Sequence, residues 1–256
     1  MITIISPAKT LDFTEDNRID LHLKPLFLKE ASIIAKEMKS YSPEEIEKLM
    51  RISPKLAELN YSRYKEWNKK ETDNIKPAIL AFRGDVYQAL NVDTLSKENL
   101  DFANDHLRIL SGLYGILRPY DTIMPYRLEM GTSLKFHEYN NLYEFWREKL
   151  TEKFRKELSG HKHKAIINLA SEEYSKAINF KKLPEDIKVI DIDFKEFRNG
   201  NYKTVGILAK RARGYMTRYI LENYIDNPEE LKDFDLEGYE FHDTMSSNKN
   251  WVFIRN

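Results

Sequence analysis

The sequence contains no cysteine among its 256 residues. This absence excludes a disulfide scaffold, a metal site built from thiolates and a peroxidase that depends on a reactive thiol. It also suits a reducing compartment, where proteins rarely keep disulfides. Direct destruction of peroxide by a cysteine is therefore outside the chemistry of this chain.

Neither sign of charge is in excess, and long apolar runs are absent. The 41 lysines and arginines balance 41 aspartates and glutamates, so the net charge favours no particular partner. Any binding of an anion must then come from a local cluster of basic residues. No run approaches the ~20 apolar residues that span a membrane, and residues 1–10 lack the basic and apolar segments of a secretory signal. We therefore expect a cytoplasmic protein without a membrane partner.

Motifs for nucleotide cofactors and signs of internal duplication are missing too. The chain has neither a Walker loop nor the GxGxxG dinucleotide fingerprint, and we expect no cofactor. Repeats, low-complexity tracts and obvious linkers are absent, while hydrophobic residues make up 41% of the chain, enough for a real core. The expected architecture is one compact α/β (mixed α+β) domain over residues 1–256, with a central mixed sheet surrounded by helices.

Local patterns predict the elements of that domain. Short apolar runs predict strands at residues 2–5, 78–82, 165–169, 187–197 and 251–254. The Asn199-Gly200 pair between two β-rich runs is typical of a hairpin turn. Serine-proline start signals predict helices from Ser42 and Ser53. Apolar residues at three- and four-residue spacings predict further helices at residues 96–111, 141–158 and 210–224.

The block from residue 106 to residue 131 has the most distinctive composition. Gly112 and Gly115 are spaced for a tight backbone turn, and three arginines lie nearby, namely Arg108, Arg118 and Arg127. One interpretation is a helix-hairpin-helix, in which small residues let the hairpin N–H groups bind DNA phosphates regardless of sequence. The usual hairpin has one residue between the glycines, whereas this one has two. The other interpretation is a helix end followed by a packing turn.

A second basic segment lies between residues 197 and 221. It contains no acid, and its basic residues are Arg198, Lys203, Lys210, Arg211, Arg213 and Arg218. Acids dominate residues 222–243, so one interpretation is a solvated basic helix that pairs with an acidic neighbour. The other is a phosphate site, because residues 210–214 are expected at a strand-to-helix junction, where backbone N–H groups also favour anions.

Polar residues at expected strand ends suggest a small-molecule pocket. Ser6 and Lys9 have the serine–lysine spacing of acyl-transferring hydrolases, although Pro7 explains Ser6 as a helix cap. Lys9 is better suited as an anion ligand. Since α/β proteins place their sites at strand ends, an enzyme acting on a nucleotide, a nucleobase or another phosphorylated compound would use the set Ser6, Lys9, Thr10, Asp85, Tyr87 and Arg127.

Candidate metal ligands are sparse in the sequence. His161 and His163 share a polar loop without a carboxylate or cysteine beside them, which is typical of surface histidines. Asp191 and Asp193 alternate along an expected strand, and such a pair more often marks the solvent face of a hairpin than a cation site. An iron-binding or iron-sequestering protein would need carboxylates and histidines to converge, which the spacing does not show, so no metal site is predicted.

Seven blocks, in the same order, resemble one bacterial family. They span essentially the whole chain and are similar to the YaaA peroxide-stress proteins of bacteria. The blocks are IISPAKTLDF (residues 4–13), LMRISPKLAELN (49–60), AILAFRGDVYQAL (78–90), HLRILSGLYGILRP (106–119), MPYRLEMG (124–131), INLASEEY (167–174) and KRARGYMTRYILEN (210–223).

The resemblance implies survival of hydrogen peroxide through lower free intracellular iron, and sequence-independent binding of double-stranded or structured DNA. The DNA would contact a helix-hairpin-helix and a positively charged cleft. Carried onto this sequence, the hairpin is Gly112 to Gly115, and the cleft draws on Lys9, Arg51, Arg83, Arg118, Arg127 and the segment from Lys210 to Arg218. Because thiols and visible haem or metal motifs are missing, this role fits the chain better than enzymatic removal of peroxide.

Overall fold

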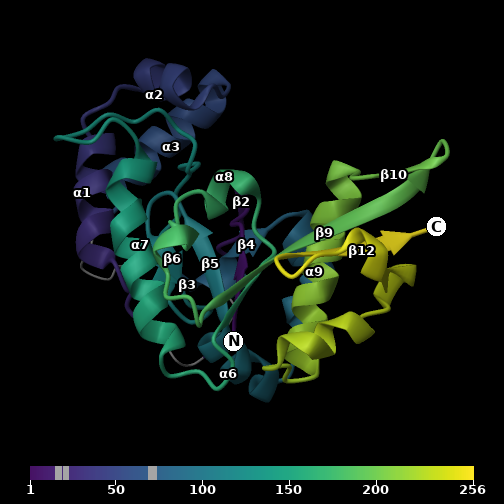
Figure 1. The fold of residues 1–256 in the computed structure, drawn as a ribbon. Coiled ribbons are helices and arrows are strands. Elements are labelled where there is room, and N and C mark those ends of the chain that lie inside the picture. The colour runs from purple at the N-terminus through teal and green to yellow at the C-terminus, as the bar shows by residue number, and fades with distance from the viewer. Residues whose placement is uncertain (15–18, 20–22, 69–73) are drawn as a thin grey trace.

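The computed structural model describes residues 1–14, 19, 23–68 and 74–256, and its centre is a mixed sheet with helices around it (Figure 1). β1 (Ile2–Ile5) runs through the middle of this sheet and is buried along its whole length. β5 (Leu107–Ser111) and β8 (Ala165–Asn168) flank β1 in parallel orientation. Their continuous apolar runs suit strands that are covered on both faces. The predicted α/β class with a central mixed sheet is confirmed.

The sheet continues on both sides of these three strands, in the order β11-β12-β9-β8-β1-β5-β6. β9 (Lys188–Arg198) and β12 (Asn250–Arg255) extend the parallel part. The antiparallel strands lie at the two edges, and they are β6 (Gly115–Leu117) and β11 (Glu240–Phe241). Since β1, β5, β8, β9 and β12 all point the same way, their carboxyl ends meet along one edge of the sheet.

A hairpin links β9 to β10 (Asn201–Lys203) outside the main strand order. Its turn residues, Asn199 and Gly200, have positive φ angles of 51° and 79°. Two consecutive residues of this conformation are typical of a two-residue hairpin turn. The hairpin predicted from the Asn-Gly pair is therefore confirmed.

Helices surround the sheet on both sides (Figure 1). On the side of β5 and β6 lie α1 (Leu28–Met38) and α7 (Leu142–Leu158), and α2 (Pro43–Met50) and α3 (Pro54–Glu66) lie above them in this view. Beside β9 and β12 lies α9 (Gly206–Glu222), which packs on α5 (Asp85–Leu90). The remaining α-helices are α4 (Ala78–Ala81), α6 (Lys97–His106) and α8 (Glu172–Ser175).

Short elements complete the described chain. Two-stranded ladders join β2 (Thr10–Leu11) to β4 (Phe82–Arg83), and β3 (Lys76–Pro77) to β7 (Thr122–Ile123). The 3₁₀ turns are Val92–Thr94, Phe180–Lys182, Pro228–Asp233, Leu236–Gly238 and Asp243–Met245.

The predicted helix starts at Ser42 and Ser53 are confirmed. Ser42 and Glu45 form the full capping box, with Pro43 in the first turn of α2. Ser53 precedes α3 in an extended conformation, although its side chain makes no capping hydrogen bond. The expected helix at residues 141–158 is also present, and the Asn141 side chain caps it by accepting a bond from the Glu144 N–H.

Three predicted elements are wrong. Residues 78–82 form the helix α4 and only the start of β4, because the buried apolar run suits a helix as well as a strand. The helix predicted through residue 111 ends at His106, and the next five residues form β5. The helix that carries Lys210 begins at Gly206, so residues 210–213 lie inside α9 and not at its amino end.

The predicted helix-hairpin-helix is likewise wrong. Gly112 and Gly115 turn the chain between β5 and β6, which form an antiparallel β-hairpin. The whole turn is buried, and the Gly112 carbonyl accepts a hydrogen bond from the Trp146 indole at 2.9 Å. A Cβ on Gly112 would lie 2.4 Å from the Leu128 carbonyl oxygen. The glycines therefore serve packing, and the turn N–H groups do not face solvent.

Gly214 marks the closest approach of two helices. A Cβ at this position of α9 would lie 2.2 Å from the Val86 carbonyl oxygen and 2.7 Å from the Ala89 Cβ, both on α5. Only a residue without a side chain permits such contact. Among the described residues, no helix is both long enough and apolar enough to cross a membrane.

Candidate functional site

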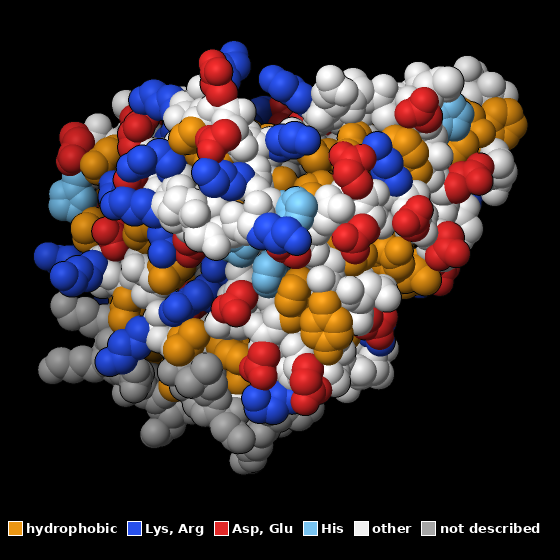
Figure 2. Space-filling view, turned by 60° about the horizontal axis from the view of Figure 1, so that its bottom comes forward, with side chains coloured by type: hydrophobic (Ala, Val, Ile, Leu, Met, Phe, Trp, Pro, Cys, Tyr) orange, Lys and Arg blue, Asp and Glu red, His pale blue; other side chains and the backbone are white. Residues whose placement is uncertain are grey.

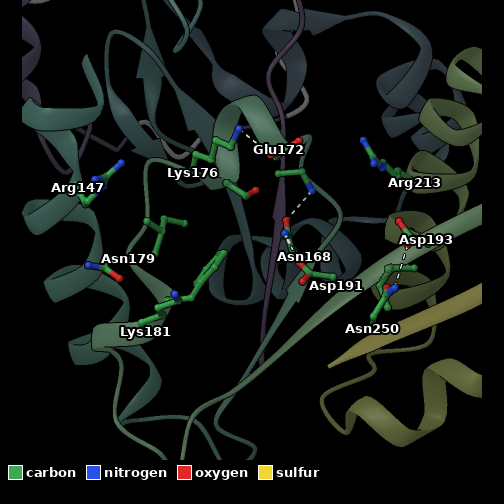
Figure 3. A pocket seen from close by; sticks show the side chains of 15 residues that line it. Arg147, Asn168, Glu172, Lys176, Asn179, Lys181, Asp191, Asp193, Arg213 and Asn250 are labelled. Carbon is green, nitrogen blue, oxygen red and sulfur yellow. Dashed lines mark hydrogen bonds and ion pairs between the residues drawn. The ribbon is translucent and has the colours of Figure 1, made fainter. Parts of the chain in front are cut away.

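A polar cleft of about 680 Å³ lies between the two halves of the sheet's helical cover (Figure 3). α7 and the segment after α8 border one side, and α9 borders the other. The floor comes from β8, β9 and β12, near the carboxyl end of β8. This edge is where α/β sheets usually place their ligands.

The floor carries a row of amide and carboxylate side chains. Asn168, Asp191 and Asn250 occupy neighbouring positions on three parallel strands. Asn168 donates to Asp191 at 2.6 Å, and Asn250 donates to Asp193 at 3.1 Å. The Asn250 Oδ1 atom is buried and, among the described residues, has no donor. Asp191 and Asp193 therefore face a cleft, whereas their alternation suggested the solvent side of a hairpin.

Four basic side chains line this space, and one of them, Lys176, pairs with Glu172 at 2.7 Å. The other three, which we term the cleft cations, line its sides. They are Arg147 from α7, Lys181 from a 3₁₀ turn and Arg213 from α9 (Figure 3). Within the described parts of the chain, none of them forms an ion pair with a carboxylate. Burial lowers the pKa of Arg213, and Asp193 partly offsets this effect. Its Nε atom is buried without a hydrogen-bond acceptor among the described residues. An anion would supply that acceptor.

The carboxyl end of β1 forms a separate, tighter cluster. Ser6 Oγ accepts the Ser171 N–H at 2.8 Å, and Tyr87 donates to the Ser6 carbonyl at 3.0 Å. Burial raises the pKa of Tyr87 well above its ordinary value. Lys9 pairs with Glu129 at 3.1 Å, and Arg127 pairs with the same carboxylate at 2.8 Å. The hollow beside Lys9 and Arg127 holds only about 10 Å³, so it offers no room for a nucleotide.

Other predicted site residues are dispersed. Thr10 is exposed in β2, and Asp85 opens α5. Neither of them lines the hollow beside Lys9, and Ser6 and Tyr87 do not line it either. The predicted small-molecule set therefore does not meet in the hollow beside Lys9.

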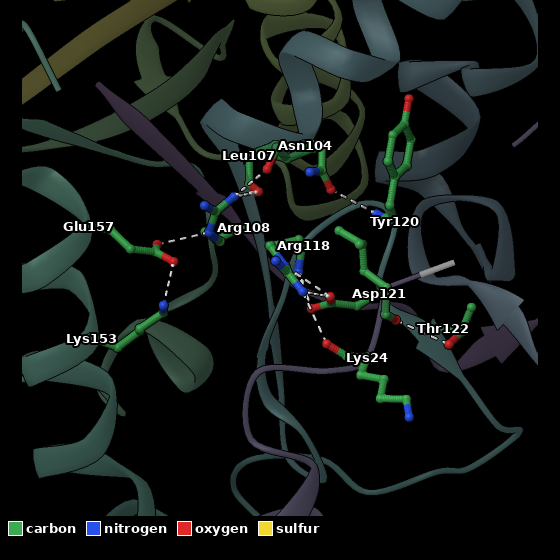
Figure 4. A network of polar contacts seen from close by, with 11 residues as sticks. Lys24, Asn104, Leu107, Arg108, Arg118, Tyr120, Asp121, Thr122, Lys153 and Glu157 are labelled. Atoms are coloured by element: carbon green, nitrogen blue, oxygen red, sulfur yellow. Dashed lines mark hydrogen bonds and ion pairs between the residues drawn. The ribbon is translucent and has the colours of Figure 1, made fainter. Parts of the chain in front are cut away.

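Several predicted phosphate ligands already have internal partners. Arg118 holds Asp121 through two nitrogens, at 2.9 and 2.7 Å, and donates to the Lys24 carbonyl (Figure 4). Arg83 pairs with Asp12 at 3.3 Å, and Arg218 pairs with Glu222 at 2.6 Å. Arg51, Lys210 and Arg211 are exposed. Of the predicted phosphate ligands, Arg213 alone is among the residues lining the polar cleft.

Sequence reasoning missed most of the cleft. Arg147 lies on the exposed side of an amphipathic helix, and Lys181 lies in a polar stretch, so each looks like an ordinary surface residue. Asn168 ends a buried strand, and its polar side chain at that point was a usable signal. The alternation of Asp191 and Asp193 predicted that both side chains lie on the solvent face of a hairpin.

A second polar hollow, of about 470 Å³, lies below the amino ends of β1, β5 and β8. Its walls include His106, His161 and Asp226, which come from three distant parts of the sequence. Burial lowers the pKa of His161 to about 4, helped by the nearby amino group of Met1. Burial also lowers the pKa of His106 below its ordinary value.

The sheet order and the cleft define an open-sheet α/β protein with a polar cleft along its strand ends. Comparison with known proteins agrees on one family: the chain matches the family of the peroxide stress protein YaaA over residues 1–245. It is 47% identical to a UPF0246 protein of Clostridium beijerinckii over 255 residues, covering 100% of this chain and 98% of that protein. Matches to UPF0246 proteins of Acaryochloris marina (46% identical) and Crocosphaera subtropica (44%) cover 100% of both chains.

The chain belongs to the YaaA family of peroxide stress proteins. The match runs through both halves of the sheet, since residues 1–245 include every strand from β1 to β11. The resemblance drawn from the seven sequence blocks is thereby confirmed.

Proposed function

We propose that this peroxide stress protein binds DNA without sequence preference, with backbone phosphates held by the cleft cations. The observation that carries the proposal is Arg213, whose guanidinium lines the cleft with a buried Nε and no carboxylate partner among the described residues. A buried donor without an acceptor destabilises the free protein by about 1–3 kcal/mol. A phosphate oxygen would remove that deficit and would neutralise the charge.

The remaining cleft cations extend the site across the opening. Arg147 and Lys181 lie on the side opposite Arg213, so a phosphate between them meets positive charge from both walls (Figure 3). Lys210 precedes Arg213 by three residues on α9, which puts the two side chains on neighbouring turns of one helix side. Lys210 is exposed and extends the basic surface beyond the cleft. The carboxylates of Asp191 and Asp193 on the cleft floor repel anions. A bound phosphate would therefore lie against the walls of the cleft.

Fluorescence anisotropy with labelled duplexes of different sequence tests this proposal. Replacing both Arg147 and Lys181 by alanine should weaken binding to all sequences alike. The magnitude of the negative slope of log affinity against log salt should decrease by about 1.8, at ~0.9 for each lost phosphate contact. The matched control is the double change of Arg155 and Lys156 to alanine, since both residues lie exposed on the same helix outside the cleft.

The control variant loses two positive charges, as the cleft variant does. Any difference in DNA affinity between the two variants therefore comes from where the charges lie. If both double variants lose affinity equally, any basic surface suffices and the cleft is not the DNA site. Binding that does not change with salt would also contradict phosphate contacts. Arg213→Gln provides a third comparison, because it keeps a polar side chain at the buried position and removes the charge.

A nucleotide or another phosphorylated small molecule is the second candidate ligand. The volume of about 680 Å³ is within the ~300–1,000 Å³ typical of small-molecule pockets. Arg213 Nε offers a donor and Asn250 Oδ1 an acceptor, each without a partner in the described structure. Calorimetric titration with nucleoside monophosphates tests this alternative. Micromolar binding that Arg213→Gln abolishes, combined with no binding of duplex DNA, would favour the small-molecule ligand.

The peroxide role itself is tested in cells that lack this protein. We propose that DNA binding and lower free intracellular iron both contribute to survival, because the chain has no cysteine for direct chemistry with peroxide. Cells carrying the variant with alanine at Arg147 and Lys181 should accumulate more DNA damage under peroxide than cells carrying the Arg155 and Lys156 control. Equal DNA damage in both strains would show that the cleft cations do not contribute to protection against peroxide.

A further inference from the structure

We propose that His106, His161 and Asp226 form a binding site for a divalent transition-metal ion. The three residues offer one ligand atom each, and these atoms all lie within 4.8 Å of one another. Two imidazoles and one carboxylate are donors that first-row transition metals prefer, whereas calcium and magnesium favour oxygen ligands alone. None of the three residues belongs to the proposed DNA site.

Binding an ion requires the ligand atoms, which lie up to 4.8 Å apart, to draw closer together. His106 Nδ1 lies 3.6 Å from Asp226 Oδ1. Ligands that are each ~2.1 Å from one metal ion lie about 3.0–3.4 Å from one another. His106 Nδ1 also lies 2.9 Å from the Met1 carbonyl oxygen. Coordination through Nε2 keeps that hydrogen bond as outer-sphere support, and coordination through Nδ1 replaces it.

A positive group already occupies the space between these ligands. The amino group of Met1 donates a short hydrogen bond to Asp226 and lies 3.3 Å from His161 Nδ1. The carboxylate and the imidazole lone pair therefore already face one cation. A divalent ion at this point would take over the same partners with twice the charge.

The surroundings leave room beside the site. The hollow of about 470 Å³ beside the cluster leaves room for water to complete the coordination sphere. Arg108 lines the hollow and pairs with Glu157 at 2.9 Å, a carboxylate that it shares with Lys153 (Figure 4). Acidic and basic side chains are mixed on the face of the molecule in Figure 2.

The position of the cluster suggests what the ion does. His106 ends α6 directly before β5, His161 lies in the loop before β8, and Asp226 follows α9. A bound ion would join the amino ends of the central strands to the helix that lines the cleft. The site thus lies at the opposite ends of the strands from the cleft floor, and its occupancy is independent of DNA.

Titration of the full chain, with any purification tag removed, tests the proposal with Co²⁺ and Zn²⁺ as probes. We expect one ion per chain and visible absorption bands of Co²⁺ that report nitrogen and oxygen ligands. His106→Gln and His161→Gln should each weaken binding at least about 100-fold, since even outer-sphere changes typically weaken it 10- to 100-fold. His163→Gln is the matched control, because His163 lies in the same loop but outside the cluster.

Asp226 also holds the Met1 amino group, so Asp226→Asn can disturb folding as well as binding. X-ray absorption of the Co²⁺-loaded wild-type protein avoids this problem, and its first shell should contain two imidazoles. A shell without imidazole, or unchanged affinity in both histidine variants, would overturn the proposal. Loss of Co²⁺ binding in the variant with alanine at Arg147 and Lys181 would contradict the separation of the two sites.

Discussion

Substituting alanine for Gly214 tests the packing that positions the cleft. Alanine inside a helix normally stabilises it by about 1 kcal/mol relative to glycine. Here the new Cβ would lie 2.2 Å from the Val86 carbonyl oxygen and 3.0 Å from the Leu90 nitrogen. Both are backbone atoms, which cannot move away by rotation of a side chain. The helices α5 and α9 must therefore separate, so we expect the variant to lose stability.

The size of the loss follows from two opposing effects. Overpacking of a close-packed interior typically costs ~1–3 kcal/mol, and a backbone clash belongs at or above the upper end. Subtracting the gain in helix propensity leaves a net destabilisation of about 2–3 kcal/mol. For a chain of this length, that corresponds to a fall in melting temperature of about 4–12 °C.

Gly206→Ala supplies the matched control on the same helix. A Cβ at Gly206 meets no atom within 4 Å, so this variant should be neutral or slightly stabilised. Urea unfolding followed by circular dichroism measures both variants against the wild type. If Gly214→Ala is as stable as Gly206→Ala, the close approach of α5 and α9 is refuted. Since α9 also carries Arg213, weaker DNA binding should accompany the loss of stability in Gly214→Ala only.

Three further changes test the core and the ionic contacts. Asp121→Ala leaves the Arg118 guanidinium without its buried carboxylate, so urea unfolding should show a loss of about 3–5 kcal/mol. Gly115→Ala should lower the melting temperature, because it forces φ of +70° on alanine and puts a Cβ 2.7 Å from the Trp146 ring. The pKa of His161 is lowered to about 4 from 6.5, so the unfolded chain binds more protons between these values. In metal-free buffer, stability should therefore fall as pH drops from about 6.5 to 4, by at most ~1–2 kcal/mol for a half-exposed group, and His161→Gln should remove that slope.

Patterns that are local in the sequence predicted local structure well. The capping box at Ser42 and the turn at Asn199-Gly200 are present because each depends on residues next to one another. Residues 107–111 were assigned to a helix because their apolar positions continue the spacing of the preceding helix. Tertiary pairing with β1 makes them a strand instead, and a short, fully buried run cannot distinguish the two states.

Neither candidate site has a local signature. The cleft combines residues from β8, α7, β9, α9 and β12, which only the sheet order brings together. The histidine cluster joins residues 106, 161 and 226, and no spacing rule connects them. Arg118 and Arg127 pair with the nearby Asp121 and Glu129, which the composition of the block does not reveal. Ion pairing inside the fold, rather than composition, decides which cations remain available for a ligand.

The central place of β1 affects how the chain is made as well as how it is held. Its neighbours in the sheet are residues 107–111 and 165–168, which leave the ribosome long after residues 2–5. At 5–20 residues per second, β8 follows β1 by roughly 8–30 seconds. During that time an apolar strand has one partner or none. A chaperone that holds the nascent chain is therefore most useful to this protein early in its synthesis.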